Sequence, residues 1–220
     1  MIICHSRRFI YFSNPFCGSG RVRDLLEPWN EEPIVAFDQR IPERPFYTHM
    51  SPTEAEWTFD ALGLNFGDYR RITSLRSPFE RLPEVYEEIE RTDPIWRMRK
   101  RSGVGIPSFE SWLARTRPDG RGAGGRPHQR WRRFGTWSAE QWCAGRITQV
   151  LCCHRMNDDI STLLKNLGVA PSKPLPPGCD ADNEQGHGLL TPQSLAMICE
   201  RYGPEIEEYG FKPPDLQIAA

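Results

Sequence analysis

Three short β-prone runs, each followed by residues with helical spacing, constrain the fold of this chain most. The runs lie at Phe9–Phe12, Arg71–Leu75 and Ile147–Cys153, and Ile34–Phe37 is a candidate for one more strand. Strands that alternate with helices form mainly parallel sheets covered on both faces. The sequence therefore predicts an α/β protein, a three-layer sandwich with a mainly parallel central sheet flanked by helices.

Capping residues predict where the helices begin and end. The predicted signals are a capping box at Ser51–Glu54, a cap at Ser108, caps at Asn157 or Asp158 with a stop at Gly168, and a start at Thr191-Pro192 with a stop at Gly203. Pro83 falls inside the helix that follows the Arg71–Leu75 strand, and a bend is expected there.

The junction between this strand and its helix has the composition of an anion site. Ser77 is a cap, Pro78 suits the first helical position, and Glu80 completes a capping box. The helix N-terminus therefore lies beside Arg76, where the guanidinium and the free N–H groups favour a phosphate. The alternative is an ordinary capped helix whose arginines meet surface carboxylates.

The middle of the chain is strongly basic, although the formal net charge of the whole chain is −1. Between Arg97 and Arg133 there are eleven Arg or Lys residues and two acids. Trp96, Trp112, Trp131 and Phe134 interleave with these arginines, which makes nucleic-acid binding an alternative function. The glycine-rich stretch 118–127 is expected to be a mobile loop. A solvated surface loop is the simpler interpretation of the charge.

The 220 residues are 38% hydrophobic, which fits one domain with a sizeable core. No apolar run approaches the roughly 20 residues of a bilayer span, and the N-terminus lacks the apolar core of a secretory signal. A cytoplasmic location is expected. The seven cysteines are expected to be reduced, and Cys143, Cys152, Cys153 and His154 fit core packing better than a metal site.

Several short motifs in order along the chain resemble the sulfotransferase family, in particular its small bacterial and carbohydrate-type members. They are the turn Asn14–Arg21 after the first strand, the pair His49-Met50, the stretch Arg76–Arg81, and the closing stretch from Tyr202 to Phe211. Proteins with this architecture bind phosphates at such a strand-turn-helix junction.

The resemblance implies a P-loop NTPase-like fold of the sulfotransferase type, with residues 1–220 as one domain and a basic, partly mobile insertion around 91–135. It implies a sulfotransferase that moves a sulfuryl group from 3′-phosphoadenosine 5′-phosphosulfate to a hydroxyl or amine of an acceptor such as a carbohydrate or small metabolite. The residues implied for the donor site are Pro15, Phe16, Cys17, Gly18, Ser19, Gly20 and Arg21 for the 5′-phosphosulfate and Arg76 for the 3′-phosphate. His49 is the implied base. No metal, no membrane and no nucleic acid is expected, and a homodimer is left open.

The chain departs from the family pattern at three positions. Phe16 follows the proline where the family has lysine, and Arg21 follows the glycines where it has a Thr-Ser pair. Arg21 could supply the missing charge in catalysis. Glu84 stands where the family has a serine in the 3′-phosphate motif, and its carboxylate would repel a phosphate. A catalytically inactive binding or scaffold protein of the same fold is therefore the main alternative function.

Overall fold

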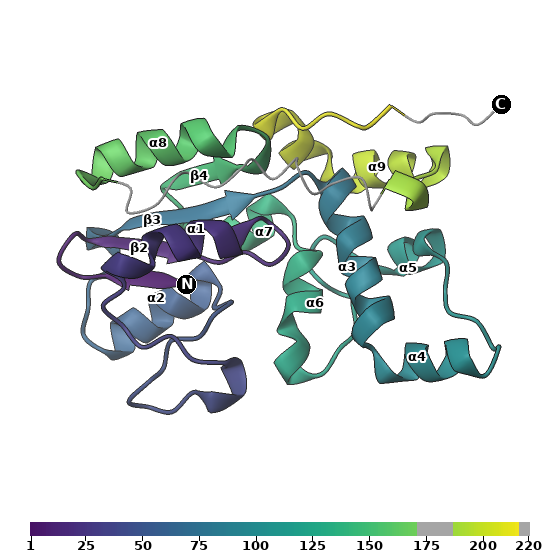
Figure 1. Cartoon of the computed structure of the whole chain (residues 1–220), viewed down its shortest axis with the longest axis horizontal. Coiled ribbons are helices and arrows are strands. Elements are labelled where there is room, and N and C mark those ends of the chain that lie inside the picture. The colour runs from purple at the N-terminus through teal and green to yellow at the C-terminus, as the bar shows by residue number, and fades with distance from the viewer. Residues whose placement is uncertain (171–186, 216–220) are drawn as a thin grey trace. The chain divides into compact units, whose positions relative to one another are not determined.

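The computed structural model describes residues 1–170 and 187–215 (Figure 1). It is an α/β protein with one open, mixed four-stranded sheet and about nine helices in the described part. The chain divides into two compact units. Of the described residues, 1–76 and 142–170 form the first unit, which contains the sheet, and 77–141 and 187–215 form the second.

The sheet places its strands in the order β1-β2-β3-β4. The strands are β1 (Ile2–Cys4), β2 (Phe9–Phe12), β3 (Arg70–Leu75) and β4 (Gln149–Cys152). β1 and β2 form an antiparallel hairpin, whereas β2, β3 and β4 run parallel. Phe12 pairs with Thr73, and Leu75 pairs with Cys152. The carboxyl ends of the three parallel strands therefore lie along one edge of the sheet.

Helices cover both faces of the sheet in the first unit. They are α1 (Ser19–Leu26), α2 (Pro52–Ala61) and α8 (Met156–Leu167). α1 and α8 share a buried cluster with alternate strand residues such as Tyr11, Ile72 and Leu151. On the opposite face, Phe59 of α2 packs against Phe66 and Tyr69. In Figure 1, α8 and α2 lie on opposite sides of the sheet.

The second unit is helical. Its elements are α3 (Pro78–Thr92), α4 (Pro94–Arg101), α5 (Phe109–Arg115), α6 (Arg130–Gly135) and α9 (Pro192–Tyr209), and α7 (Ala139–Cys143) crosses the boundary in sequence. α3 packs against α4, α5, α6 and α9. Its Tyr86 ring contacts Phe109 and Trp112 of α5 at 5.6 and 5.7 Å between centroids. These aromatic contacts account for the buried face of α3 that the helical spacing of its apolar residues predicts.

The prediction of a strand at Ile34–Phe37 is wrong. Only Val35 makes an isolated bridge, with Tyr47, and a 3₁₀ turn follows at Phe37–Gln39. The N–H of Val35 donates to the carbonyl of Phe46, outside the sheet. The segment is partly exposed, so it offers too little apolar surface to enter the core. The fully buried Ile2–Cys4 takes the free edge beside β2 instead.

Most of the predicted caps are confirmed, and two helix limits are wrong. Ser51, Ser108 and Thr191 cap their helices, and Gly168 ends α8 with a φ of 63°. The N-cap position of α8 is Arg155, two or three residues before the predicted cap, and it makes no side-chain cap, so the helix begins at Met156; α9 runs past Gly203 and Pro204 to Tyr209.

Tertiary contacts explain why α9 does not stop at Gly203. The Tyr202 hydroxyl donates to the carbonyl of Thr136 at 2.7 Å, and Glu205 pairs with Arg81 at 2.9 Å. Both side chains are buried, so the segment on each side of Gly203 is anchored in helical conformation. α3 likewise runs through Pro83, which is buried, as one helix to Thr92.

The glycine-rich stretch 118–127, expected to be a mobile loop, is tied to its surroundings by hydrogen bonds. The indole N–H of Trp137 donates to the carbonyl of Asp119 at 2.8 Å. The backbone N–H of Ser138 donates to the carbonyl of Pro118, also at 2.8 Å. Gly122 packs so closely that a Cβ there would lie 1.9 Å from the carbonyl oxygen of Arg115. The glycines therefore permit close packing in this turn.

No helix in the described part of the chain combines the length and the apolar character needed to cross a lipid bilayer.

Candidate functional site

The turn between β2 and α1 lies at the carboxyl edge of the sheet, where the sequence places it. Gly18 adopts the left-handed conformation (φ 64°, ψ 15°) directly before the first helical residue, Ser19. Consecutive left-handed and right-handed residues turn successive N–H groups toward one side, which forms a small concave site for an anion. The positive end of α1 adds to this preference. Arg21 lies half-buried in the first turn of the helix.

Phe16 carries the most unusual backbone of this turn. Its φ is 60°, a conformation that bulky side chains rarely adopt. The neighbouring Pro15 and Cys17 are buried, and Gly20 is exposed. A residue held in a sparsely populated conformation is maintained by its surroundings, and such residues cluster at functional sites. The strain therefore marks the same turn that the sequence motif singles out.

Asn14, for which the sequence predicts no role, is a buried polar residue at the start of the turn. It is 1% exposed, and its side-chain oxygen has no hydrogen-bond partner among the described residues. Leaving a buried amide unsatisfied costs about 1–3 kcal/mol. The amide is therefore a group for which a ligand or an ordered water supplies the missing partner.

His49 lies against this turn, although 36 residues separate it from Ser13. Its Nδ1 donates to the carbonyl of Ser13 at 2.8 Å. A carbonyl only accepts hydrogen bonds, so the neutral imidazole carries its proton on Nδ1 and its basic lone pair on Nε2. Burial lowers the pKa of His49, and the nearby charge of Arg23 contributes in the same direction. At neutral pH the ring is therefore a neutral base.

Arg76 follows β3 at the same edge. Thr73 pairs with Phe12, so the segment after Thr73 and the turn after Phe12 leave the sheet in the same direction from adjacent parallel strands. Arg76 itself is 8% exposed. Ser77 caps α3 by accepting a hydrogen bond from the N–H of Phe79 at 3.3 Å, as the sequence predicts for a cap at this residue.

Glu84 belongs to α3, in the second unit, whereas the turn and Arg76 belong to the first. Burial raises the pKa of Glu87, and the charges of Glu84 and Glu90 raise it further. Glu84 is thus part of an acidic row along α3. Its expected role beside the 3′-phosphate remains a prediction.

A hollow in the first unit lies close to these groups, and sequence patterns did not indicate it. It has a volume of about 360 Å³ and is lined by Arg23 of α1 and by Glu27, which opens the 3₁₀ turn after α1. Asn30, Glu32 and Thr48 line it as well. Thr48 precedes His49, so the hollow adjoins the segment that carries the candidate base. Only folding brings residues 23–34 and 48 together, which is why no local pattern reveals the site.

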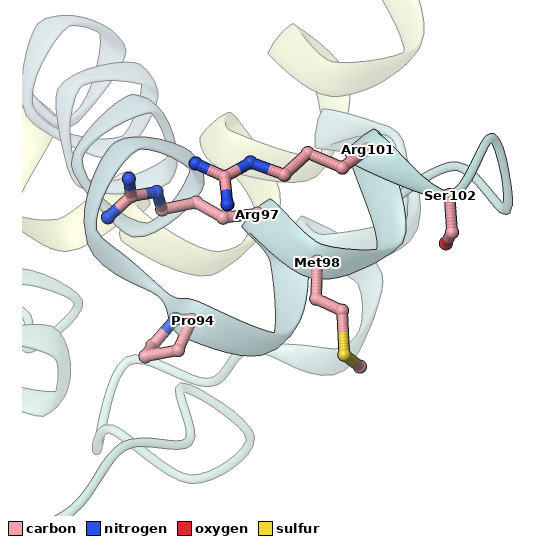
Figure 2. A pocket seen from close by; sticks show the side chains of 5 residues that line it. All are labelled: Pro94, Arg97, Met98, Arg101 and Ser102. Carbon is pink, nitrogen blue, oxygen red and sulfur yellow. The ribbon is translucent and has the colours of Figure 1, made fainter.

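Of the four aromatic residues that interleave with the arginines of the basic segment, two are buried and two, Trp96 and Trp131, are half-buried. Trp112 and Phe134 are 5% and 2% exposed, and Trp96 packs edge-on against Tyr86. An open hollow of about 470 Å³ does lie on α4, lined by Pro94, Arg97, Met98, Arg101 and Ser102 (Figure 2). The described residues contain no group of three or more His, Cys, Asp or Glu side chains placed to hold a metal ion.

Comparison of the chain with models of protein families, with curated proteins and with solved structures finds no match in any of the three.

Proposed function

We propose that the protein is a sulfotransferase with a P-loop NTPase-like, three-layer fold, and that it uses 3′-phosphoadenosine 5′-phosphosulfate as donor. In this reaction an acceptor oxygen or nitrogen bonds to the sulfur of the donor. The bond from sulfur to the bridging oxygen breaks, and 3′-phosphoadenosine 5′-phosphate leaves. The proton of the acceptor passes to Nε2 of His49. Such a transfer needs in-line positioning, cationic groups near the developing charge and a base.

One observation carries the proposal: the Gly18 turn and His49 lie together at the sheet edge from which Arg76 also emerges. The left-handed Gly18 and the N-terminus of α1 suit the phosphosulfate, and the hydrogen bond to Ser13 leaves Nε2 of His49 as the base. The side-chain oxygen of Asn14, which has no hydrogen-bond partner among the described residues, can accept a hydrogen bond from a hydroxyl or amine of the acceptor or donor nucleotide. Arg76 is the proposed partner of the 3′-phosphate.

A non-catalytic nucleotide-binding protein is the second candidate. Phe16 occupies the position at which the family carries lysine, and its backbone has the left-handed conformation, with a φ of 60°. Without that lysine, Arg21 is the nearest cationic residue of the turn in sequence, and it would have to balance the charge of the leaving group. Binding of the desulfonated nucleotide without sulfuryl transfer would favour this candidate.

Calorimetry with 3′-phosphoadenosine 5′-phosphate tests the donor site. Gly18→Ala places a Cβ at a left-handed residue, which costs about 1–2 kcal/mol, and should weaken nucleotide binding at least tenfold. Gly168→Ala is the matched control, because Gly168 has a φ of 63° at the end of α8 and no described residue lies within 4 Å of a Cβ added there. It should lose similar stability and keep its affinity. Equal affinity of the two variants, or no binding by the unmodified protein, would contradict the proposal.

The base is tested by sulfuryl transfer with His49→Gln. A glutamine keeps a donor for the Ser13 carbonyl but cannot accept a proton, so we expect the rate to fall about 10²- to 10⁴-fold with nucleotide affinity unchanged. Because burial lowers the pKa of His49 below its ordinary value of 6.5, activity should hold to below that pH and then fall as the ring protonates. A variant as active as the unmodified protein would remove His49 from the mechanism.

A further inference from the structure

Helix α4 and the turn after it form a surface that the proposed reaction does not use. We call residues 94–105 the α4 surface. No residue of α4 is buried, and Trp96 alone among its apolar residues makes a described ring contact, with Tyr86 at 5.5 Å. Ile95, Met98 and Val104 are 62%, 62% and 65% exposed. Three large apolar side chains therefore protrude within ten residues of chain.

The turn after α4 is built to present Val104. Gly103 and Gly105 on either side of it are both left-handed, with φ of 73° and 74°. The N–H of Val104 donates to the carbonyl of Arg99 at 3.0 Å, which closes the turn against the end of the helix. The valine is thus held at the tip of an ordered turn, where it packs against little of the protein.

The same surface carries guanidinium groups without acidic partners. Arg97 and Arg101 are four residues apart, on one face of α4, and Figure 2 shows both side chains extending from it in the same direction. Within residues 1–170 and 187–215, neither side chain forms an ion pair or hydrogen bond. By contrast, Lys100 pairs with Glu90, and Arg99 donates to the carbonyl of Gly105. Both unpaired arginines line the hollow of about 470 Å³.

We infer that the α4 surface docks on a lipid bilayer that contains anionic headgroups. Arg97 and Arg101 would bind headgroup phosphates, and Met98 and Val104 would enter the boundary between headgroups and acyl chains. Exposed aliphatic side chains flanked by cations are the features of an interfacial segment. The inference is independent of the proposed reaction. The sequence predicts no membrane partner because no apolar run is long enough to span a bilayer. That argument does not apply to a helix that only touches the bilayer surface.

Other anionic partners fit the α4 surface less well. Single-stranded nucleic acids bind through aromatic side chains on which bases stack, and the protruding residues here are aliphatic. An acidic protein would need a groove shaped to receive the side chains of Ile95, Met98 and Val104, which are more than 60% exposed. A fluid bilayer needs no such complementary shape, because lipids move aside around an inserted side chain.

Co-sedimentation of the full chain with vesicles tests the inference. Vesicles of equal parts phosphatidylcholine and phosphatidylserine should sediment the protein, and vesicles of phosphatidylcholine alone should not. Arg97→Ala with Arg101→Ala should weaken binding about thirtyfold, since each cation near an anionic surface contributes about a factor of five. Met98→Ser with Val104→Ser should weaken it about tenfold or more.

Two controls make the result decisive. Arg117→Ala with Arg126→Ala removes the same charge from exposed positions of the second unit outside the α4 surface and should leave binding unchanged. Because every substituted residue is exposed, all variants should keep the melting temperature of the unmodified protein. Failure to sediment with anionic vesicles, or an equal loss in the control pair, overturns the inference. So does tighter binding to polyglutamate or to an oligonucleotide that Met98→Ser with Val104→Ser does not weaken.

Discussion

Arg81 and Glu205 form an ion pair that is shielded from water. Their side chains are 1% and 3% exposed and 2.9 Å apart, and Glu205 also accepts a hydrogen bond from the N–H of Ala139. Each charge alone would cost several kcal/mol to bury, so the two residues stabilise the helical unit only as a pair. The pair joins α3 to α9, which are far apart in sequence.

Glu205→Gln removes the carboxylate that lies 2.9 Å from the buried Arg81 guanidinium. We expect the free energy of unfolding to fall by about 3–5 kcal/mol, measured by urea denaturation. The double variant Arg81→Met with Glu205→Leu removes both charges and should recover most of that loss. If the double variant is as unstable as the single one, the charge pair is not the cause.

The lowered pKa of Asp93 predicts how the free energy of unfolding depends on pH. Burial favours its protonated form, but hydrogen bonds from Arg132 and from the N–H groups of Trp96 and Ile95 outweigh burial and lower the pKa of Asp93. A lowered carboxyl pKa stabilises the fold above the unfolded value of about 4 and loses this effect as the pH falls through the folded value. Nη1 of Arg132 is 2.7 Å from Asp93, and among the described residues its Nε and Nη2 have no hydrogen-bond partner.

Asp93→Asn keeps a good helix cap but removes the charge. The unfolding free energy of the unmodified protein should therefore fall more steeply than that of the variant between about pH 5 and about pH 3. Urea denaturation at a series of pH values measures both slopes. Parallel curves would show that another carboxylate governs the acid transition.

Among the elements, the glycine-rich turn at 118–127 shows how composition alone misleads. Many glycines suggest a chain that cannot order itself, yet this turn is hydrogen-bonded to residues 137 and 138. Gly122 is there because nothing larger fits beside the Arg115 carbonyl. A glycine can therefore mark close packing as well as freedom, and only neighbours distant in sequence distinguish the two.

Gly122→Ala and Gly124→Ala test this distinction. Both glycines are left-handed, with φ of 80° and 68°, but in the described part of the chain a Cβ at Gly124 meets nothing within 4 Å. We expect Gly124→Ala to cost about 1–2 kcal/mol for its backbone alone and Gly122→Ala clearly more, since backbone must move to admit the methyl group. Thermal unfolding measures both. Equal losses would mean that the turn is loosely packed.

At the scale of the whole molecule, the reactivity of the cysteine thiols can show whether the core unfolds cooperatively. Cys4, Cys17, Cys152 and Cys153 are buried, whereas Cys199 is exposed. Burial raises the pKa of Cys152 to about 11, which suppresses its reactive thiolate. The four buried thiols all belong to the first unit, which contains the sheet.

A thiol reagent should modify Cys199 quickly in the native protein and the four buried thiols only on unfolding. Mass spectrometry after timed labelling in increasing urea measures each site. The buried thiols should become reactive together, at the urea concentration at which near-ultraviolet circular dichroism is lost, because they share one core. Labelling of Cys17 well before Cys4 and Cys153 would instead indicate local opening of the turn after β2.

Local sequence determined the features that depend on neighbours along the chain. Short apolar runs and capping residues predicted β2, most of β3, all of β4 and the starts of α2, α5 and α9, because caps and periodicity act within a few residues. The same patterns singled out the turn at Asn14–Arg21 and the capped helix after Arg76.

Tertiary structure decided whatever depends on residues distant in sequence. It made Ile2–Cys4 an edge strand and left Ile34–Phe37 outside the sheet, since pairing depends on which segment buries more apolar surface against β2. It carried α9 past Gly203 through the contacts of Tyr202 and Glu205. It placed His49 against the Ser13 carbonyl, and a spacing of 36 residues has no local signature from which that contact could be predicted.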